Sequence, residues 1–158
     1  CAERVVGKEP FALLLADDFI TYSGNGITSD LISGYEKTGK SQLSVMNVDG
    51  PDISKYGVIV PNNKTGLVTG LMEKPNFENA PSNLASIGRY VLTPDIFDIL
   101  RNQSIGVGGE IQLADSINVQ AENNRVETVL LNGKHYDCGS VEGYIEAIKD
   151  VASNYKFD

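Results

Sequence analysis

Two adjacent carboxylates, Asp17 and Asp18, follow the apolar run 11–16. A short continuous apolar run of this kind predicts a strand that is buried on both faces. Ligands of open α/β sheets bind beyond the carboxyl ends of strands, and Mg²⁺ prefers one or two carboxylates together with phosphate oxygens. Successive strand residues point to opposite faces, so only one of the two side chains can face a given ligand. The pair is therefore either a Mg²⁺ site or two Asp residues that begin a turn.

Another charged pair, Glu73 and Lys74, stands before Pro75 at the end of an expected strand. An ammonium group is a compact charge suited to phosphate, and a carboxylate accepts hydrogen bonds from sugar hydroxyls. Asp137 lies in the Tyr-Asp-Cys-Gly-Ser run at 136–140, where it is a candidate for a second metal ligand. Taken singly, each of these motifs also fits solvated charges at the ends of strands and helices.

The other reactive side chains exclude several catalytic classes. His135 is the only histidine, and neither a three-ligand metal triad nor a Ser-His-Asp set can be built around it. Cys138 would need a depressed pKa and a base to act as a nucleophile, so we interpret it as a small buried hydrophobic residue. The Gly-rich stretch 106–109 matches neither a P-loop nor a dinucleotide fingerprint, and it fits either a flexible loop or a ligand loop.

The elements expected to position these residues alternate between strands and helices. A strand at 11–16, a helix at 29–39 and a strand at 43–48 favour a right-handed crossover in a mostly parallel sheet. Further strands are expected at 56–60, 67–73, 86–92 and 126–131, and further helices after Thr93-Pro94, from near Glu110 and at 140–152. This pattern predicts an α/β fold.

Composition excludes several functional classes. The 158 residues are 41% hydrophobic and 22% charged, which is a globular balance. The net charge of −8 without a Lys/Arg cluster argues against binding to nucleic acid or an anionic membrane. No apolar run approaches the roughly 20 residues of a membrane helix. Two cysteines are too few for a disulfide framework, so a reducing, cytoplasmic setting is expected.

Taken together and in order, the motifs resemble those of the bacterial UTP–glucose-1-phosphate uridylyltransferases, or UDP-glucose pyrophosphorylases. The matching segments are Glu9–Asp18, Lys55–Ile59, Glu73–Pro75, Ala80–Pro94, Gly108–Leu113 and Tyr136–Ser140. The resemblance implies a nucleotidyltransferase-type, Rossmann-like α/β fold with a mixed sheet flanked by helices. It also implies that UTP and glucose 1-phosphate form UDP-glucose and pyrophosphate with Mg²⁺ as cofactor. The attacking phosphate is already an anion, so this reaction needs no general base.

The same resemblance assigns the residues at the phosphates. Asp17 is similar to the main Mg²⁺ ligand at the nucleotide phosphates, and Asp137 resembles a second acidic position near the metal. Lys74 resembles the lysine that contacts the phosphates. Asp17 and Lys74 are therefore the expected catalytic residues, acting by charge neutralisation rather than by proton transfer.

The sugar-binding residues follow from the resemblance as well. Glu73 is similar to the acid that binds glucose hydroxyls, and Gly57 would contact the sugar through its backbone. Asn83 would line the same sugar pocket as Gly57. Glu110 and the glycine before it would shape the pocket rim or a subunit contact.

The sequence departs from the family pattern in its nucleotide-binding segment. The family's G-x-G-x-R-x-x-P-x-T-K pattern is absent from the 158 residues, Ala16 stands where Pro or Gly is usual, and Val141 stands where Lys is common. We therefore expect residues 1–158 to form a single partial domain, the sugar-binding and C-terminal portion of a nucleotidyltransferase, with an incomplete sheet. Alone it should show negligible turnover.

Two other functions remain open at this point. One is a different sugar-1-phosphate nucleotidyltransferase that uses dTTP or CTP, because the absent segment reads the base. The other is a non-catalytic homologue acting as a binding or regulatory subunit. The expected partners of the parent enzyme are UTP, UDP-glucose and glucose 1-phosphate, without nucleic acid or membrane, and the parent is expected to be a homo-oligomer.

Overall fold

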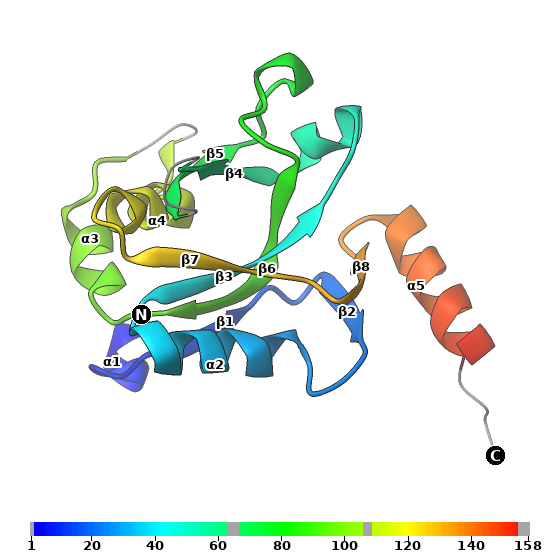
Figure 1. Ribbon diagram of the computed structural model, residues 1–158, viewed down its shortest axis with the longest axis horizontal. Helices are drawn as coiled ribbons and strands as arrows, with labels where there is room; N and C mark the ends of the chain where they lie inside the picture. Colours follow the sequence, from blue (N-terminus) through cyan, green and yellow to red (C-terminus); the bar gives the residue numbers. More distant parts are fainter. Residues whose placement is uncertain (1, 63–66, 106–108, 155–158) are drawn as a thin grey trace.

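The computed structural model describes residues 2–62, 67–105 and 109–154. Within these ranges, most strands join one mixed sheet in the order β5-β4-β6-β3-β7, with β1 also paired to β6 (Figure 1). Its strands are β1 (Phe11–Leu14), β3 (Ser41–Asn47), β4 (Gly57–Pro61), β5 (Val68–Glu73), β6 (Leu84–Leu92) and β7 (Val126–Leu130). The predicted α/β class with a mixed sheet is confirmed.

The long strand β6 organises this sheet. It runs antiparallel to β3 on one side and to β4 and β1 on the other, with Gly57 opposite Ser86 and Leu14 opposite Arg89. Strand β7 is parallel to β3. The expectation of a mostly parallel sheet is therefore wrong. Strands β1 and β3 do run in the same direction, but the antiparallel β6 lies between them.

Strand β1 is covered on one face only. Phe11 and Leu13 are half-buried, and the ring of Phe11 stacks on Phe97 with centroids 5.1 Å apart. The alternate residues, Ala12 and Leu14, are exposed. The prediction that this strand is buried on both faces is wrong because, among the described residues, only β6 pairs with it and nothing covers its second face.

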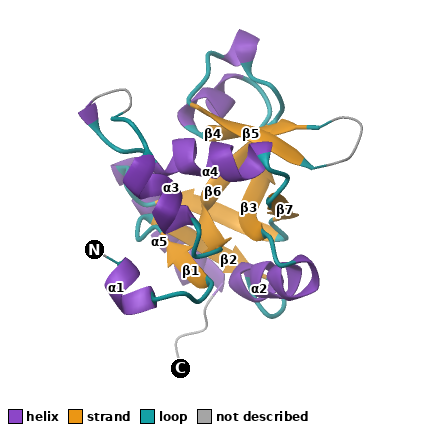
Figure 2. Cartoon of the chain, turned by 90° about the vertical axis from the view of Figure 1, so that its left-hand side faces the viewer, coloured by secondary structure: helices purple, strands orange, loops and turns teal. Residues whose placement is uncertain are grey.

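Helices lie on both faces of the sheet (Figure 2). Helix α2 (Ile27–Thr38) buries Ile27 and Leu31 against Val91 of β6. Helices α3 (Ile96–Asn102) and α4 (Leu113–Glu122) cover the opposite face, where Leu92 packs with Ile117 and other apolar side chains. Adjacent strand residues face opposite sides, so Val91 and Leu92 belong to two separate cores. Short helical turns also form at α1 (Glu3–Val6), η1 (Pro51–Lys55) and η2 (Phe77–Asn79).

A small second sheet carries the last helix. Strand β2 (Asp18–Tyr22) pairs antiparallel with β8 (Gly133–Asp137), and helix α5 (Val141–Asn154) packs on β8 (Figure 1). Lys134 Nζ lies 3.2 Å from both Glu146 Oε1 and Asp150 Oδ2, which ties α5 to this two-stranded sheet. Neither β2 nor β8 was expected from the sequence. No helix within the described ranges has the length and apolar character needed to span a membrane.

Candidate active site

The pairing of β2 with β8 brings the two predicted metal residues together. Asp18 lies opposite Asp137 in the register, and the Cys138 N–H donates to the Asp17 carbonyl at 2.8 Å. A Cβ added to Gly139 would lie 3.0 Å from Asp17 Oδ2 and 3.1 Å from Asp137 Oδ1. Two exposed carboxylates therefore flank one point, and the missing side chain of Gly139 leaves that point open.

This geometry fits Mg²⁺ in one particular way. Within the described part of the chain, no group of three or more His, Cys, Asp or Glu side chains could hold a metal ion. Mg²⁺ does not need such a cage, because it is usually bound by one or two carboxylates and completed by waters and substrate phosphates. The Asp17 and Asp137 pair is therefore suited to a cation that arrives with, or is completed by, phosphate oxygens.

Asp18 does a different job from its neighbour. Its side chain is 17% exposed, its Oδ2 accepts the Gly88 N–H at 2.8 Å, and its Oδ1 hydrogen-bonds with His135 Nε2. Burial alone raises the pKa of Asp18, but the hydrogen bonds and charge of its neighbours, led by His135, lower that pKa below its usual value. Asp18 thus anchors the chain to β6 and leaves Asp17 to face solvent.

The predicted sugar residues Gly57, Glu73 and Lys74 line one cavity of about 620 Å³. A Cβ on Gly57 would lie 3.1 Å from Glu73 Oε2, so the glycine leaves that carboxylate accessible. Lys74 Nζ lies 3.9 Å from Glu73 Oε1. The remaining walls come from the turn after β1, from β5 and β6, from the segment before α4 and from α4 itself. They consist of Leu15, Leu71, Ser86, Tyr90, Glu110, Ile111, Gln112, Leu113, Ala114 and Ile117.

Lys74 has an unusual backbone conformation at the mouth of this cavity. Its φ is +45°, a left-handed region that costs a residue with a side chain about 1 kcal/mol or more. Its N–H donates to the Tyr56 carbonyl at 3.0 Å, which helps to hold the bend. The ring of Tyr56 meets the His135 ring edge-on at 6.2 Å. Tyr56 therefore connects this cavity with strand β8, which ends at Asp137.

The structure does not bring Asn83 to the cavity. Asn83 is exposed, its Nδ2 lies 3.4 Å from Asp49 Oδ1, and its carbonyl accepts the Val48 N–H at 2.9 Å. Asn83 precedes β6, whereas the β6 residues that line the cavity are Ser86, which lies opposite Gly57, and Tyr90. Asn83 therefore does not line the same cavity as Gly57, Glu73 and Lys74, although the sequence predicted that it would.

Two hydroxyl groups of the cavity were missed by sequence reasoning. Ser86 and Tyr90 lie on the same face of β6, and their oxygens are 3.2 Å apart. Burial raises the pKa of Tyr90, which keeps the phenol neutral and able to donate a hydrogen bond. The available signal was the even spacing of two hydroxyl side chains along a strand, which places them on one face. Glu110 lies at the cavity, as expected for a rim residue, whereas Gly106 and Gly108 are outside the described residues.

A further cavity, of about 430 Å³, lies between β2, Cys138 and helix α5. It is lined by Ala16, Phe19, Cys138, Tyr144, Ala147, Ile148, Val151 and Ala152. None of these side chains is charged, so this groove offers nothing to neutralise a phosphate. Cys138, interpreted from the sequence as a small buried hydrophobic residue, is only partly buried here.

Known proteins resemble this chain in both sequence and structure. The UTP–glucose-1-phosphate uridylyltransferase of Pseudomonas aeruginosa is 44% identical over 147 residues, which are 90% of this chain and 53% of that protein. The enzyme of the same name from Streptococcus pyogenes is 43% identical over 158 residues, covering 96% of this chain and 52% of that protein. The chain therefore spans about half the length of the curated relatives it matches.

Solved structures give the same picture. A UDP-glucose pyrophosphorylase complexed with UDP-glucose matches with a TM-score of 0.90 and 42% identity, over 98% of this chain and 60% of that chain. A UTP-bound UGPase from Acinetobacter baumannii matches with a TM-score of 0.86 and 34% identity, over 98% of this chain and 55% of that one. The family model described as "Nucleotidyl transferase" matches residues 1–154. The chain thus belongs to the nucleotidyl transferase family.

Proposed function

We propose that this chain is the sugar-phosphate- and metal-binding portion of a UTP–glucose-1-phosphate uridylyltransferase, which forms UDP-glucose and pyrophosphate from UTP and glucose 1-phosphate. One observation carries the proposal. Glu73, Lys74 and Gly57 line one cavity, and Tyr56 contacts His135 of β8, the strand that ends at Asp137 beside Asp17. Relatives with 42–44% identity that carry this enzyme name support the choice of reaction.

The cavity residues suit a hexose phosphate. The Glu73 carboxylate can accept hydrogen bonds from two sugar hydroxyls, and the neutral phenol of Tyr90 can donate one. The Lys74 ammonium neutralises the sugar phosphate at the cavity mouth. The bound phosphate oxygen is itself the nucleophile, so these residues act by orienting it and by lowering its electrostatic repulsion from a second phosphate.

The carboxylate pair would hold the Mg²⁺ ion. Asp17 and Asp137 would be its protein ligands, with phosphate oxygens and waters as the others, as is usual for Mg²⁺. When bound, Mg²⁺ neutralises the charge on the reacting phosphates. The chain's own contribution is to hold two carboxylates on either side of the gap left by Gly139, where a cation relieves their mutual repulsion.

The proposal extends to the setting of the enzyme. We place it in the cytoplasm, where nucleotide sugars are made from soluble phosphates, and we expect the full-length enzyme to form a homo-oligomer. The net charge of −8 makes nucleic acid an unfavourable partner.

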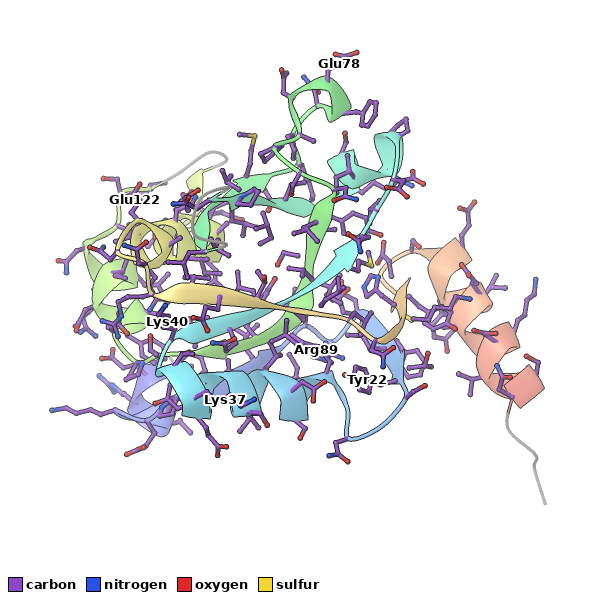
Figure 3. All side chains as sticks on the ribbon, in the orientation of Figure 1. Tyr22, Lys37, Lys40, Glu78, Arg89 and Glu122 are labelled. Atoms are coloured by element: carbon purple, nitrogen blue, oxygen red, sulfur yellow. The ribbon has the colours of Figure 1, made fainter. Side chains whose placement is uncertain are left out.

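Calorimetric titration with glucose 1-phosphate tests the binding site. Replacing Glu73 by Gln should weaken binding at least tenfold, because hydrogen bonds to a charged group contribute about 1.5–3 kcal/mol. Glu78→Gln is the matched control, since Glu78 is exposed on the η2 turn, away from the cavity (Figure 3). Failure of the unmodified chain to bind glucose 1-phosphate, or equal affinities for all three proteins, would count against the proposal.

A direct assay of UDP-glucose formation addresses the rest of the reaction. The 158 residues contain no G-x-G-x-R-x-x-P-x-T-K pattern that could grip the triphosphate. We therefore expect the chain to bind the sugar phosphate without detectable turnover when supplied with UTP and Mg²⁺. Sustained formation of UDP-glucose would show that the missing pattern is not required.

A further inference from the structure

The Arg89 guanidinium collects three backbone carbonyls around the turn that carries Asp17. Its Nη1 donates to the Leu15 carbonyl at 2.9 Å and to the Gly88 carbonyl at 2.8 Å. Its Nη2 donates to the Asp18 carbonyl at 2.5 Å. Leu15 and Asp18 stand on either side of Ala16 and Asp17, so one side chain holds both ends of the turn. Figure 3 labels Arg89 beside the N-terminal segment drawn in blue.

The same turn is fixed to β6 by two more contacts. The Leu15 N–H donates to the Gly88 carbonyl at 2.9 Å, and the Gly88 N–H donates to Asp18 Oδ2 at 2.8 Å. The approach is close because position 88 has no side chain. A Cβ there would lie 2.6 Å from the Leu15 Cβ, which is too close for two carbon atoms that are not bonded to each other. The turn is therefore held against the strand that also supplies Ser86 and Tyr90 to the sugar cavity.

The Asp17 side chain lacks such support. Within the described residues, no hydrogen bond or ion pair holds its carboxylate, and the side chain is exposed. Its direction toward the gap at Gly139 is therefore set by the backbone on either side of it. A planar guanidinium can reach carbonyls in two directions at once, which a single ammonium group cannot do.

We propose that Arg89 is a positioning residue for metal binding: it clamps the Leu15–Asp18 turn so that the Asp17 carboxylate faces Asp137 across Gly139. This inference rests on the proposed function, because it supposes that the two carboxylates hold Mg²⁺. Arg89 is not itself a cavity-lining residue, although it bonds the carbonyl of one of them, Leu15, as well as that of Asp18. It therefore acts through the Leu15–Asp18 turn rather than by touching a ligand.

Amide hydrogen exchange of the metal-free chain tests the clamp. In Arg89→Met we expect the amides of Leu15 and Cys138 to exchange at least about tenfold faster. The Leu15 amide belongs to the clamped turn, and the Cys138 amide donates to the carbonyl of Asp17 in that turn. The amides of Leu43 and Val45 in β3 should keep their rates. Arg89→Lys retains the charge and should give a smaller acceleration. Uniform acceleration at all four amides would indicate general destabilisation rather than loss of a local clamp. Unchanged rates at Leu15 and Cys138 would show that Arg89 does not hold the turn. Either result overturns the inference.

Mn²⁺ titration, followed by water-proton relaxation with glucose 1-phosphate present, tests the consequence for the metal. Arg89→Met should weaken Mn²⁺ binding about tenfold, the effect typical of losing a residue that orients a metal ligand. The control is Arg101→Lys, an exposed arginine of α3. Unchanged affinity in Arg89→Met would overturn the role of Arg89. Absence of Mn²⁺ binding to the unmodified chain would instead overturn the proposed metal site.

Discussion

The substitution Gly139→Ala should weaken metal binding while it leaves the stability of the fold nearly unchanged. The new Cβ would lie 3.0 Å from Asp17 Oδ2 and 3.1 Å from Asp137 Oδ1, closer than ordinary van der Waals contact. Gly139 is not among the glycines with positive φ, so an alanine backbone is allowed there. The two carboxylates must rotate apart, and Asp137 Oδ1 would then lose the Gly139 N–H that it accepts at 3.0 Å.

We expect a small change in the free energy of unfolding and a larger change in the free energy of metal binding. Removing a glycine stabilises by about 0.4–1 kcal/mol through the unfolded state, and losing the exposed hydrogen bond costs about 0.5–1.5 kcal/mol. The net change in the free energy of unfolding should therefore stay within about 1 kcal/mol of zero. Separation of the carboxylates should weaken Mn²⁺ binding about tenfold or more, which corresponds to about 1.4 kcal/mol.

The assay pairs urea unfolding with a Mn²⁺ titration in the presence of glucose 1-phosphate. Gly70→Ala is the matched control, because its added Cβ would also meet a carbonyl-type oxygen, Asn118 Oδ1 at 3.2 Å, in a different part of the fold. That variant should leave Mn²⁺ affinity unchanged. Normal Mn²⁺ binding by Gly139→Ala would refute the idea that the gap between the two carboxylates is the metal position.

Three further substitutions test other parts of the structure. Lys74→Gly should weaken glucose 1-phosphate binding, yet leave the free energy of unfolding unchanged or higher by up to about 1 kcal/mol, because glycine relieves the positive φ; calorimetry and thermal unfolding measure the two effects. Asn118→Leu should destabilise by roughly 2–3 kcal/mol in urea, because Asn118 pairs with both the N–H and the carbonyl of Leu71. Burial alone raises the pKa of Glu127, but hydrogen bonds and the charge of Lys40 lower it below its ordinary value of 4.5. Its contribution to stability is therefore present above that value and lost as the pH falls through the lower folded pKa, so Glu127→Gln should be about 1 kcal/mol less stable at pH 7 and equal to the unmodified chain in strong acid.

Matched controls keep these outcomes decisive. Asn124→Gly also relieves a positive φ, of 56°, and should not affect binding; equal loss of binding in both glycine variants would contradict the role of the Lys74 ammonium. Asn102→Leu removes an exposed amide and should cost far less than Asn118→Leu. Glu122→Gln, on the exposed end of α4, should show no pH-dependent difference from the unmodified chain (Figure 3).

The large sheet could be anticipated from local patterns, whereas the small one could not. Runs such as 43–48 and 86–92 mix apolar with polar residues over a strand's length, and they form β3 and β6 within a few residues of the expected bounds. Strand β8, Gly133–Asp137, contains no aliphatic side chain, and its residues are Gly, Lys, His, Tyr and Asp. Its strand conformation depends on pairing with β2, more than 110 residues away, which no local pattern reveals.

The site shows the same division. Residue types and the family resemblance were enough to select Asp17, Asp137, Gly57 and Glu73. The structure places Asp17 near Asp137, and Gly57 beside Glu73. The supporting residue Arg89 could not be selected, because its contacts are to backbone carbonyls of a segment distant in sequence. Such contacts depend on tertiary geometry rather than on side-chain spacing.

Chemical-shift mapping of glucose 1-phosphate on the isotope-labelled chain tests the central claim most directly. The account predicts that the largest amide shifts occur at Gly57, Lys74 and Tyr90, which line the 620 Å³ cavity. Shifts concentrated on the α5 groove, at Phe19 and Tyr144, or no shifts at saturating ligand, would contradict the assignment of this cavity to the sugar phosphate.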